Sequence, residues 1–333
     1  MSEKKTSRAG LVTSLLLTTV LLLTGLWAVA NRQYIYDQLR VWDYTPSTEV
    51  STITNQLSLT DEGTFWLYVT HPTVEDANTF SQLCPKQEEN NPILGCYTGD
   101  RIHIYDVEND SLEGIKQVTA AHEMLHSAWD RLSVGEKNYV SDLLQSEVES
   151  MNDKVFSERM RYYERNEPGQ LYNELHSIIG TEIETISGEL EKYYEQYFTD
   201  RQLIVNYHQQ YSKVFNDLIS QADQMSNQLQ TLSDEINNDR IQYEQELALL
   251  SAEIDSFNSR ADSGDFSSQA AFYAERAYLL SRSSSLEASR AALNQKIDQY
   301  NELYDSYQKI ASEIQQLNDS IDSESVVPEL PSV

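Results

Sequence analysis

The chain contains 333 residues, which is long enough for a folded core and additional elements. Its 24 Lys and Arg residues are outnumbered by 53 Asp and Glu residues, and the net charge of -29 argues against nucleic-acid binding, which needs clustered basic side chains. The low numbers of Gly (11) and Pro (7) predict mainly helical structure, and only two cysteines exclude a disulfide-dense scaffold.

The N-terminal segment has the pattern of a membrane anchor. Leu11–Ala30 carries no charge and would reach about 30 Å as a helix, the thickness of a bilayer core. Lys4, Lys5 and Arg8 precede it, so residues 1–31 are expected to be a cytoplasmic tip and a single transmembrane helix, with the body extracytoplasmic. The alternative is a signal peptide cleaved after Ala30, although the apolar run is long for one.

Cys84 and Cys96 fit an extracytoplasmic location, because an oxidising compartment would let them pair. We therefore expect a disulfide that closes a short loop. Two separate buried thiols are the alternative.

A connector is expected over 32–60, broken at Pro46, followed by a domain over 61–200. The aromatic and branched run Phe65–Val69 predicts a strand, and a helix is expected from Pro72 to about Cys84.

A β-hairpin is expected next. Leu94–Tyr97 and Arg101–Tyr105 flank the turn sequence Thr98–Asp100. The strand Arg101–Tyr105 could offer an edge to which an extended peptide substrate adds. From about Leu112 onward, the pattern predicts helices.

The last third changes character, because apolar residues recur there every seven positions. They form two series: Ala222, Leu229, Ile236, Tyr243, Leu250 and Phe257, then Leu279, Leu286, Leu293, Tyr300, Tyr307, Ile314 and Ile321. This pattern predicts an antiparallel coiled-coil hairpin over 201–321, with its turn near 258–267 and a disordered tail over 322–333. The hairpin segment 213–321 could bind a protein partner or self-associate. The alternative is two helices packed on the globular domain.

The sharpest motif is His122-Glu123-Met124-Leu125-His126, in a strongly helical stretch. A spacing of four places both imidazoles on one helix face, where they can share Zn²⁺. Glu123 follows the first His, and its carboxylate can reach a water on the metal. The alternative is a helix with one solvated and one buried histidine.

A catalytic zinc needs a third protein ligand, and the segment Asn173–Ser177 with the later Glu182 is the place to look. The paired histidines with a later Asn-Glu-x-x-Ser helix resemble the gluzincin branch of zinc metallopeptidases. That resemblance implies Glu174 as the third ligand, and His176 and Glu182 are rivals. The interval from His126 to Glu174 is similar to that of lethal-factor-like enzymes. The whole chain also resembles uncharacterised membrane-anchored zincin-like proteins of bacteria.

The resemblance is incomplete beside the third ligand. Ile178 stands where thermolysin-like enzymes carry an Asp, so the group that orients a ligand histidine is not identified. Asp130 is a substitute, or else a solvated carboxylate at a helix end. Similarity to lethal-factor-like enzymes implies Tyr163 as a donor to the oxyanion, with ordinary packing as the alternative.

Two functions follow from these observations. The first is a membrane-anchored, extracytoplasmic zinc peptidase of mainly helical α+β fold, with Glu123 as general base and a peptide or protein as substrate. The second is a non-enzymatic cell-envelope scaffold, in which the coiled coil mediates assembly and the zinc site is structural or vestigial.

Overall fold

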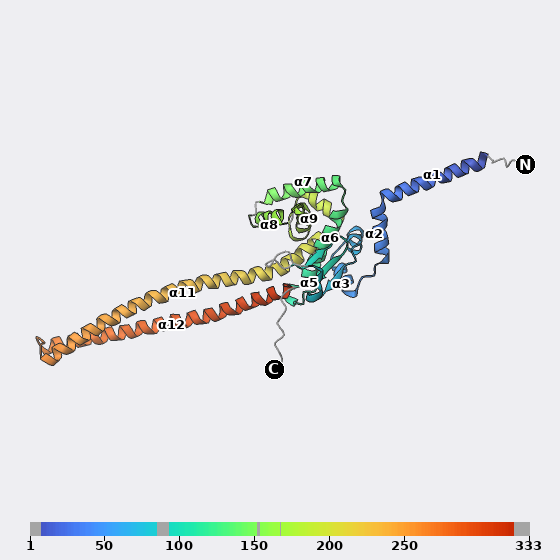
Figure 1. The fold of residues 1–333 in the computed structure, drawn as a ribbon. Helices are drawn as coiled ribbons and strands as arrows, with labels where there is room; N and C mark the ends of the chain where they lie inside the picture. The colour runs from blue at the N-terminus through green and yellow to red at the C-terminus, as the bar shows by residue number, and fades with distance from the viewer. Residues whose placement is uncertain (1–7, 85–92, 152–153, 167, 323–333) are drawn as a thin grey trace, which may run out of the picture. The chain divides into compact units, whose positions relative to one another are not determined.

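The computed structural model describes residues 8–84, 93–151, 154–166 and 168–322 (Figure 1). They are mainly helical, with one small three-stranded sheet, which confirms the predicted mainly helical α+β class. The chain divides into a body, formed by residues up to Lys213 and from Asp319, and a second unit, Val214–Asn318. The predicted cytoplasmic tip and most of the predicted tail, 323–333, lie outside the described residues.

Helix α1 (Arg8–Ala30) contains the apolar segment Val12–Ala30, which is long and apolar enough to cross a membrane. From Val12 onward its side chains are almost all exposed, as expected for a helix that is not part of a protein core. The length and composition of α1 are those of a membrane anchor or a signal sequence.

The predicted connector is part of the body. Residues 32–60 form α2 (Arg32–Asp43) and α3 (Thr48–Gln56), and the side chains of Ile53 and Leu57 are buried in the core. Pro46 lies in the extended link between the two helices, in agreement with the break predicted there. The segment folds onto the body because α3 carries an apolar face at helical spacing.

The strand predicted over Phe65–Val69 is wrong, because this run belongs to helix α4 (Asp61–Tyr68). The hydroxyl of Thr60 accepts a hydrogen bond from the N–H of Gly63, and two acidic residues occupy the first turn. These N-terminal signals favour a helix more strongly than the aromatic side chains favour a strand.

The sheet has the order β1-β3-β2, built from β1 (Thr73–Glu75), β2 (Gly95–Tyr97) and β3 (Ile102–Tyr105). The predicted hairpin is confirmed, since β2 and β3 pair antiparallel. Strand β1 falls where only a helix was expected. That helix is the shorter α5 (Ala77–Leu83).

The pairing of β1 with β3 corrects the expectation of a free edge on β3. Strand β1 runs parallel to β3, so β3 is the central strand. The edge on the other side belongs to β2. Cys84, after α5, and Cys96, in β2, lie at disulfide-bonding distance, with Cα atoms 5.9 Å apart.

Helix α6 (Ile115–Arg131) is the centre of the body, because most of its side chains are buried. It packs against α4, β2, β3 and α9 (Leu171–Glu182). The remaining helices of the body are α7 (Val134–Met151), α8 (Lys154–Asn166) and α10 (Gly188–Tyr194), and the core extends between α6, α7, α9 and α10.

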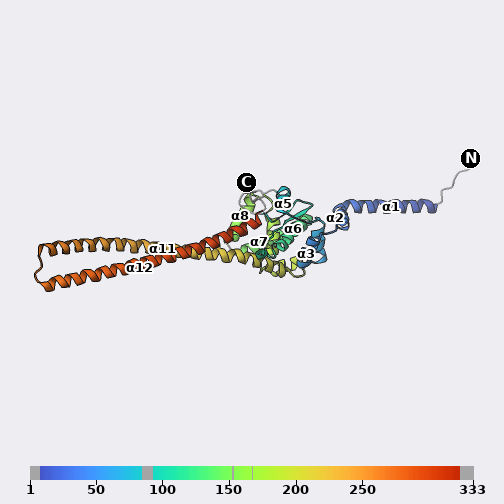
Figure 2. The same ribbon diagram turned by 90° about the horizontal axis from the view of Figure 1, so that it is seen from below.

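The second unit is an antiparallel pair formed by most of α11 (Arg201–Ser263) and most of α12 (Gln269–Ile321), which lie side by side in Figures 1 and 2. Leu250 and Phe257 pack against Leu279 and Leu286. Ion pairs cross between the helices, including Arg282 to Glu253 at 2.9 Å and Lys296 to Glu235 at 3.0 Å.

Helix α11 ends at Ser263, later than the start of the predicted turn. Gly264 has a φ of 74°, and the N–H of Asp265 donates to the carbonyl of Arg260 at 2.9 Å. The left-handed glycine and the hydrogen bond back to Arg260 cap the C-terminus of α11. The polar residues before Gly264 therefore remain helical.

Candidate metal centre

The two motif histidines share one face of α6. The ring centroids of His122 and His126 lie 4.8 Å apart. His122, Glu123 and His126 offer potential ligand atoms that all lie within 4.8 Å of one another. The spacing of four places the imidazoles one turn apart, as the sequence predicted.

Helix α9 brings Glu174 to the same place. Its Oε1 lies 3.4 Å from Nε2 of His126, and its Oε2 lies 3.8 Å from Nε2 of His122. Donor atoms about 2.0–2.1 Å from one tetrahedral zinc would lie roughly 3.3 Å from each other. The two imidazole nitrogens and this carboxylate could therefore hold one metal ion together.

His126 is oriented by two polar side chains of α9. Its Nδ1 lies 2.9 Å from Oδ1 of Asn173 and 3.2 Å from Oγ of Ser177. The amide nitrogen of Asn173 donates to Gln170, so its oxygen faces the ring and accepts from Nδ1–H. This tautomer leaves Nε2 of His126 unprotonated and able to bind a metal.

These contacts replace Asp130 in the predicted orienting role. Asp130 is exposed at the end of α6 and interacts electrostatically with Tyr97. The sequence contained a usable signal, because Asn173 and Ser177 are four residues apart and share the face of α9 that carries Glu174.

Glu123 is buried beside the histidines, between α6 and the edge strand β2. A Cβ added to Gly95 would lie 2.9 Å from Oε1 of Glu123, so only glycine permits this close approach. Burial raises the pKa of Glu123 to about 7, and the nearby Glu174 acts in the same direction. The backbone N–H of Tyr97 acts in the opposite direction, as a protonated His126 would. Gly95 and Tyr97 were not anticipated, since their closeness to Glu123 depends on how β2 packs.

The rival ligands lie elsewhere. His176 is fully buried, its Nε2 is 2.9 Å from the hydroxyl of Tyr193, and its ring packs against Trp129 and Tyr194. Its buried Nδ1 makes no hydrogen bond within the described part of the chain. Burial lowers the pKa of His176 to about 3, so it is a neutral core residue.

Glu182, the other rival, is two turns beyond Glu174 on α9. Its Oε2 lies 3.7 Å from Nε2 of His208, on the first part of α11. Tyr163, on α8, is half-buried against the hydrophobic core, and its role as an oxyanion donor stays a prediction.

Comparisons with protein-family models, with curated proteins and with solved structures found no match for this chain.

Proposed function

We propose that this chain is a zinc-dependent peptidase, held in a membrane by α1 with its body outside the cytoplasm. The observation that carries the proposal is the placement of Glu174 against both Nε2 atoms of His122 and His126, with a second carboxylate, Glu123, buried alongside. Two imidazoles and one carboxylate are a donor set that suits zinc and leaves one position open. The Cys84–Cys96 disulfide supports an oxidising compartment.

The residues of the site would have separate roles in peptide hydrolysis. A zinc ion bound by His122, His126 and Glu174 would supply Lewis-acid activation of water and of the scissile carbonyl. Glu123 accepts the proton of the attacking water and delivers it to the leaving amine. Asn173 and Ser177 hold the imidazole of His126 in its metal-binding tautomer.

We propose that an extended substrate binds along the edge strand β2. This strand lies against α6 beside Glu123, and its second edge is not paired with any described strand. A peptide that adds to this edge would use backbone hydrogen bonds for affinity, so it would be recognised by conformation more than by side-chain identity.

The decisive test compares the full chain with Glu123→Gln in detergent. We expect both proteins to retain close to one zinc per chain by elemental analysis, and only the unaltered chain to cleave an unfolded protein such as reduced casein. Loss of zinc from both proteins at neutral pH would overturn the proposal. Zinc without cleavage in either protein would favour the second candidate.

The second candidate is a non-enzymatic envelope scaffold with a structural or vestigial metal site. It is favoured by the size of the unit Val214–Asn318, a helical pair that contributes nothing to the proposed metal site. Deleting 214–318 should then abolish complex formation while leaving zinc content unchanged.

A further inference from the structure

Helix α2, which follows directly after the apolar helix α1, has an outward-facing apolar stripe. Ile35, Leu39 and Trp42 are spaced by four and three residues, so they share one face. Leu39 is 54% exposed and Trp42 is 86% exposed, whereas Ile35 is half-buried at the start of the stripe. An indole exposed to this extent is unusual for a side chain that gains most of its stabilisation by leaving water.

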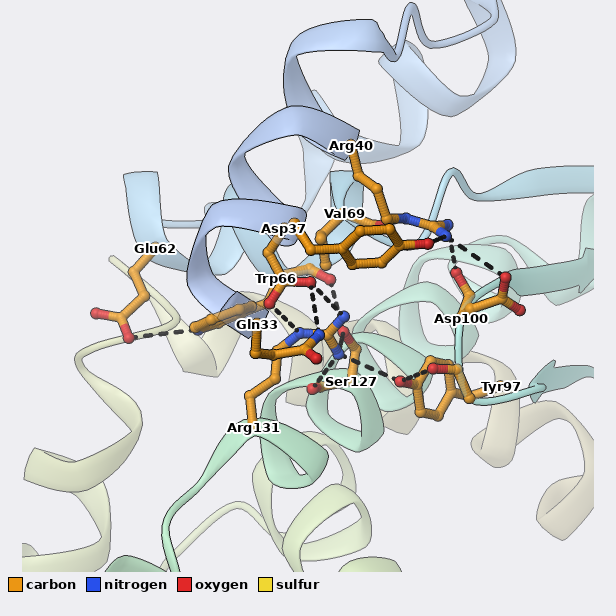
Figure 3. A network of polar contacts seen from close by, with 12 residues as sticks. Gln33, Asp37, Arg40, Glu62, Trp66, Val69, Tyr97, Asp100, Ser127 and Arg131 are labelled. Carbon is orange, nitrogen blue, oxygen red and sulfur yellow. Dashed lines mark hydrogen bonds and ion pairs between the residues drawn. The ribbon is translucent and has the colours of Figure 1, made fainter. Parts of the chain in front are cut away.

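The opposite face of α2 forms an ion pair and hydrogen bonds with the rest of the body (Figure 3). Both carboxylate oxygens of Asp37 lie 3.1 Å from the guanidinium of Arg131 at the end of α6. Arg40 donates to the carbonyl oxygens of Val69 and Asp100, at 2.7 Å each. Because these contacts fix the rotation of the helix, the apolar stripe stays turned away from the body.

The composition of α2 suits a lipid surface better than a protein partner for this acidic chain. Its two Arg and two Asp residues balance, whereas the whole chain carries a net charge of -29. Tyr34 and Tyr36 are also exposed, so three aromatic residues that carry a hydroxyl or an indole N–H are exposed on one short helix. Tyr and Trp are the residues enriched at the boundary between acyl chains and headgroups.

The length of the helix keeps the stripe close to the end of α1. Helix α2 begins two residues after Ala30 and spans only about 18 Å. With the link through Asn31 included, every residue of the stripe therefore lies within about 22 Å of the end of the apolar helix, whatever the angle between the two helices.

We propose that the stripe Ile35, Leu39 and Trp42 lies in the headgroup layer of the bilayer that α1 spans. This rests on the proposed membrane anchoring of α1. The neutral charge of α2 points to a zwitterionic surface, held by apolar and aromatic insertion and not by basic residues.

A stripe in the headgroup layer would also limit the distance between the metal centre and the membrane surface. The path from Ala30 along α2, across the Asp37–Arg131 ion pair and back along α6 to His126 is about 30 Å long. The substrates accessible to this site would therefore be peptide segments close to the membrane surface.

The test places a spin label at Leu39→Cys or Trp42→Cys in the full chain, in phosphatidylcholine nanodiscs. Cys84 and Cys96 are paired, so the new thiol takes the label. The matched control is Val134→Cys, on α7, where the native side chain is 77% exposed. We expect labels at 39 and 42 to be several-fold less accessible to a water-soluble nickel chelate, and more accessible to oxygen, than the label at 134. Equal accessibility at all three positions would overturn the proposal.

An activity measurement separates this proposal from the proposed function. The variant Leu39→Ser/Trp42→Ser should keep its zinc and its cleavage of a soluble peptide, but cleave a peptide tethered to phosphatidylcholine vesicles several-fold more slowly. If the unaltered chain cleaves neither peptide, the proposed peptidase function fails, and the spin labels still decide whether the stripe meets lipid. Equal cleavage of the tethered peptide by both proteins would contradict the proposed control of access.

Discussion

Arg131, the last residue of α6, forms a bidentate ion pair with Asp37 of α2. Its Nε and Nη2 each lie 3.1 Å from a carboxylate oxygen. Both side chains are buried, with exposed fractions of 9% and 2%. Arg131 also donates through Nη1 to the hydroxyl of Tyr97 and to the carbonyl of Ser127 (Figure 3). One guanidinium therefore connects the helix that follows the apolar helix α1, the edge strand and the helix of the candidate metal centre.

We expect Asp37→Asn to destabilise the body by about 3 kcal/mol, because it leaves a buried guanidinium without its counter-charge. All four tryptophans (27, 42, 66 and 129) lie in the body, so urea unfolding followed by tryptophan fluorescence reports on this unit. Asp43→Asn, at the exposed end of the same helix, is the control and should change stability by less than about 0.5 kcal/mol. Equal midpoints for the two variants would show that the ion pair contributes nothing.

Asn173→Ala should weaken zinc binding by roughly 10- to 100-fold, because the imidazole of His126 loses its principal orienting acceptor. Ser177→Ala should have a smaller effect, since its hydroxyl is the longer contact. Zinc affinity is measured by competition with a chromophoric chelator. Asn138→Ala, an exposed amide on α7, should bind zinc as the unaltered chain does. An unchanged affinity of Asn173→Ala would exclude the orienting role.

The features predicted correctly depend on local spacing. The interval of four between His122 and His126 requires only a helix, and the hairpin Leu94–Tyr105 requires only a turn between two short runs. The apolar residues spaced by seven likewise predict two long helices, because that periodicity is a property of each helix.

The features that were missed depend on contacts between distant parts of the chain. Asp37 and Arg131 are 94 residues apart, and nothing in either neighbourhood predicts that they pair. Strand β1 has only three residues, and it is a strand because β3 supplies its hydrogen bonds. The run at Phe65 became a helix because Thr60 caps it, which is a signal from outside the run itself.

Glu174→Gln should reduce zinc affinity by more than the roughly 10- to 100-fold expected when a residue that only orients a ligand is lost. The reason is that a neutral amide replaces the proposed anionic ligand itself. Glu182→Gln is the matched control on the same helix, where the native carboxylate lies beside His208. Zinc content after dialysis against a weak chelator gives the comparison. If Glu182→Gln loses the metal and Glu174→Gln retains it, the ligand assignment is reversed.

Gly95→Ala tests whether β2 must lie directly against α6. The added methyl carbon would meet Cγ2 of Thr119 at 2.5 Å and the side chain of Glu123 at 2.9 Å, so strand and helix must separate. We expect a loss of about 1–3 kcal/mol in stability from overpacking, and slower peptide cleavage at unchanged zinc content, because the misplaced groups are the base and the proposed substrate edge.

The control for this change is Gly135→Ala, at an open position in helix α7 where a new methyl group meets nothing within 4 Å. It should be neutral or slightly stabilising, because alanine loses less conformational freedom on folding than glycine does. Cleavage and stability are measured together for both variants. Should Gly95→Ala cleave as fast as Gly135→Ala, the close approach of β2 to Glu123 would have no part in catalysis, and the substrate would have to lie along another surface.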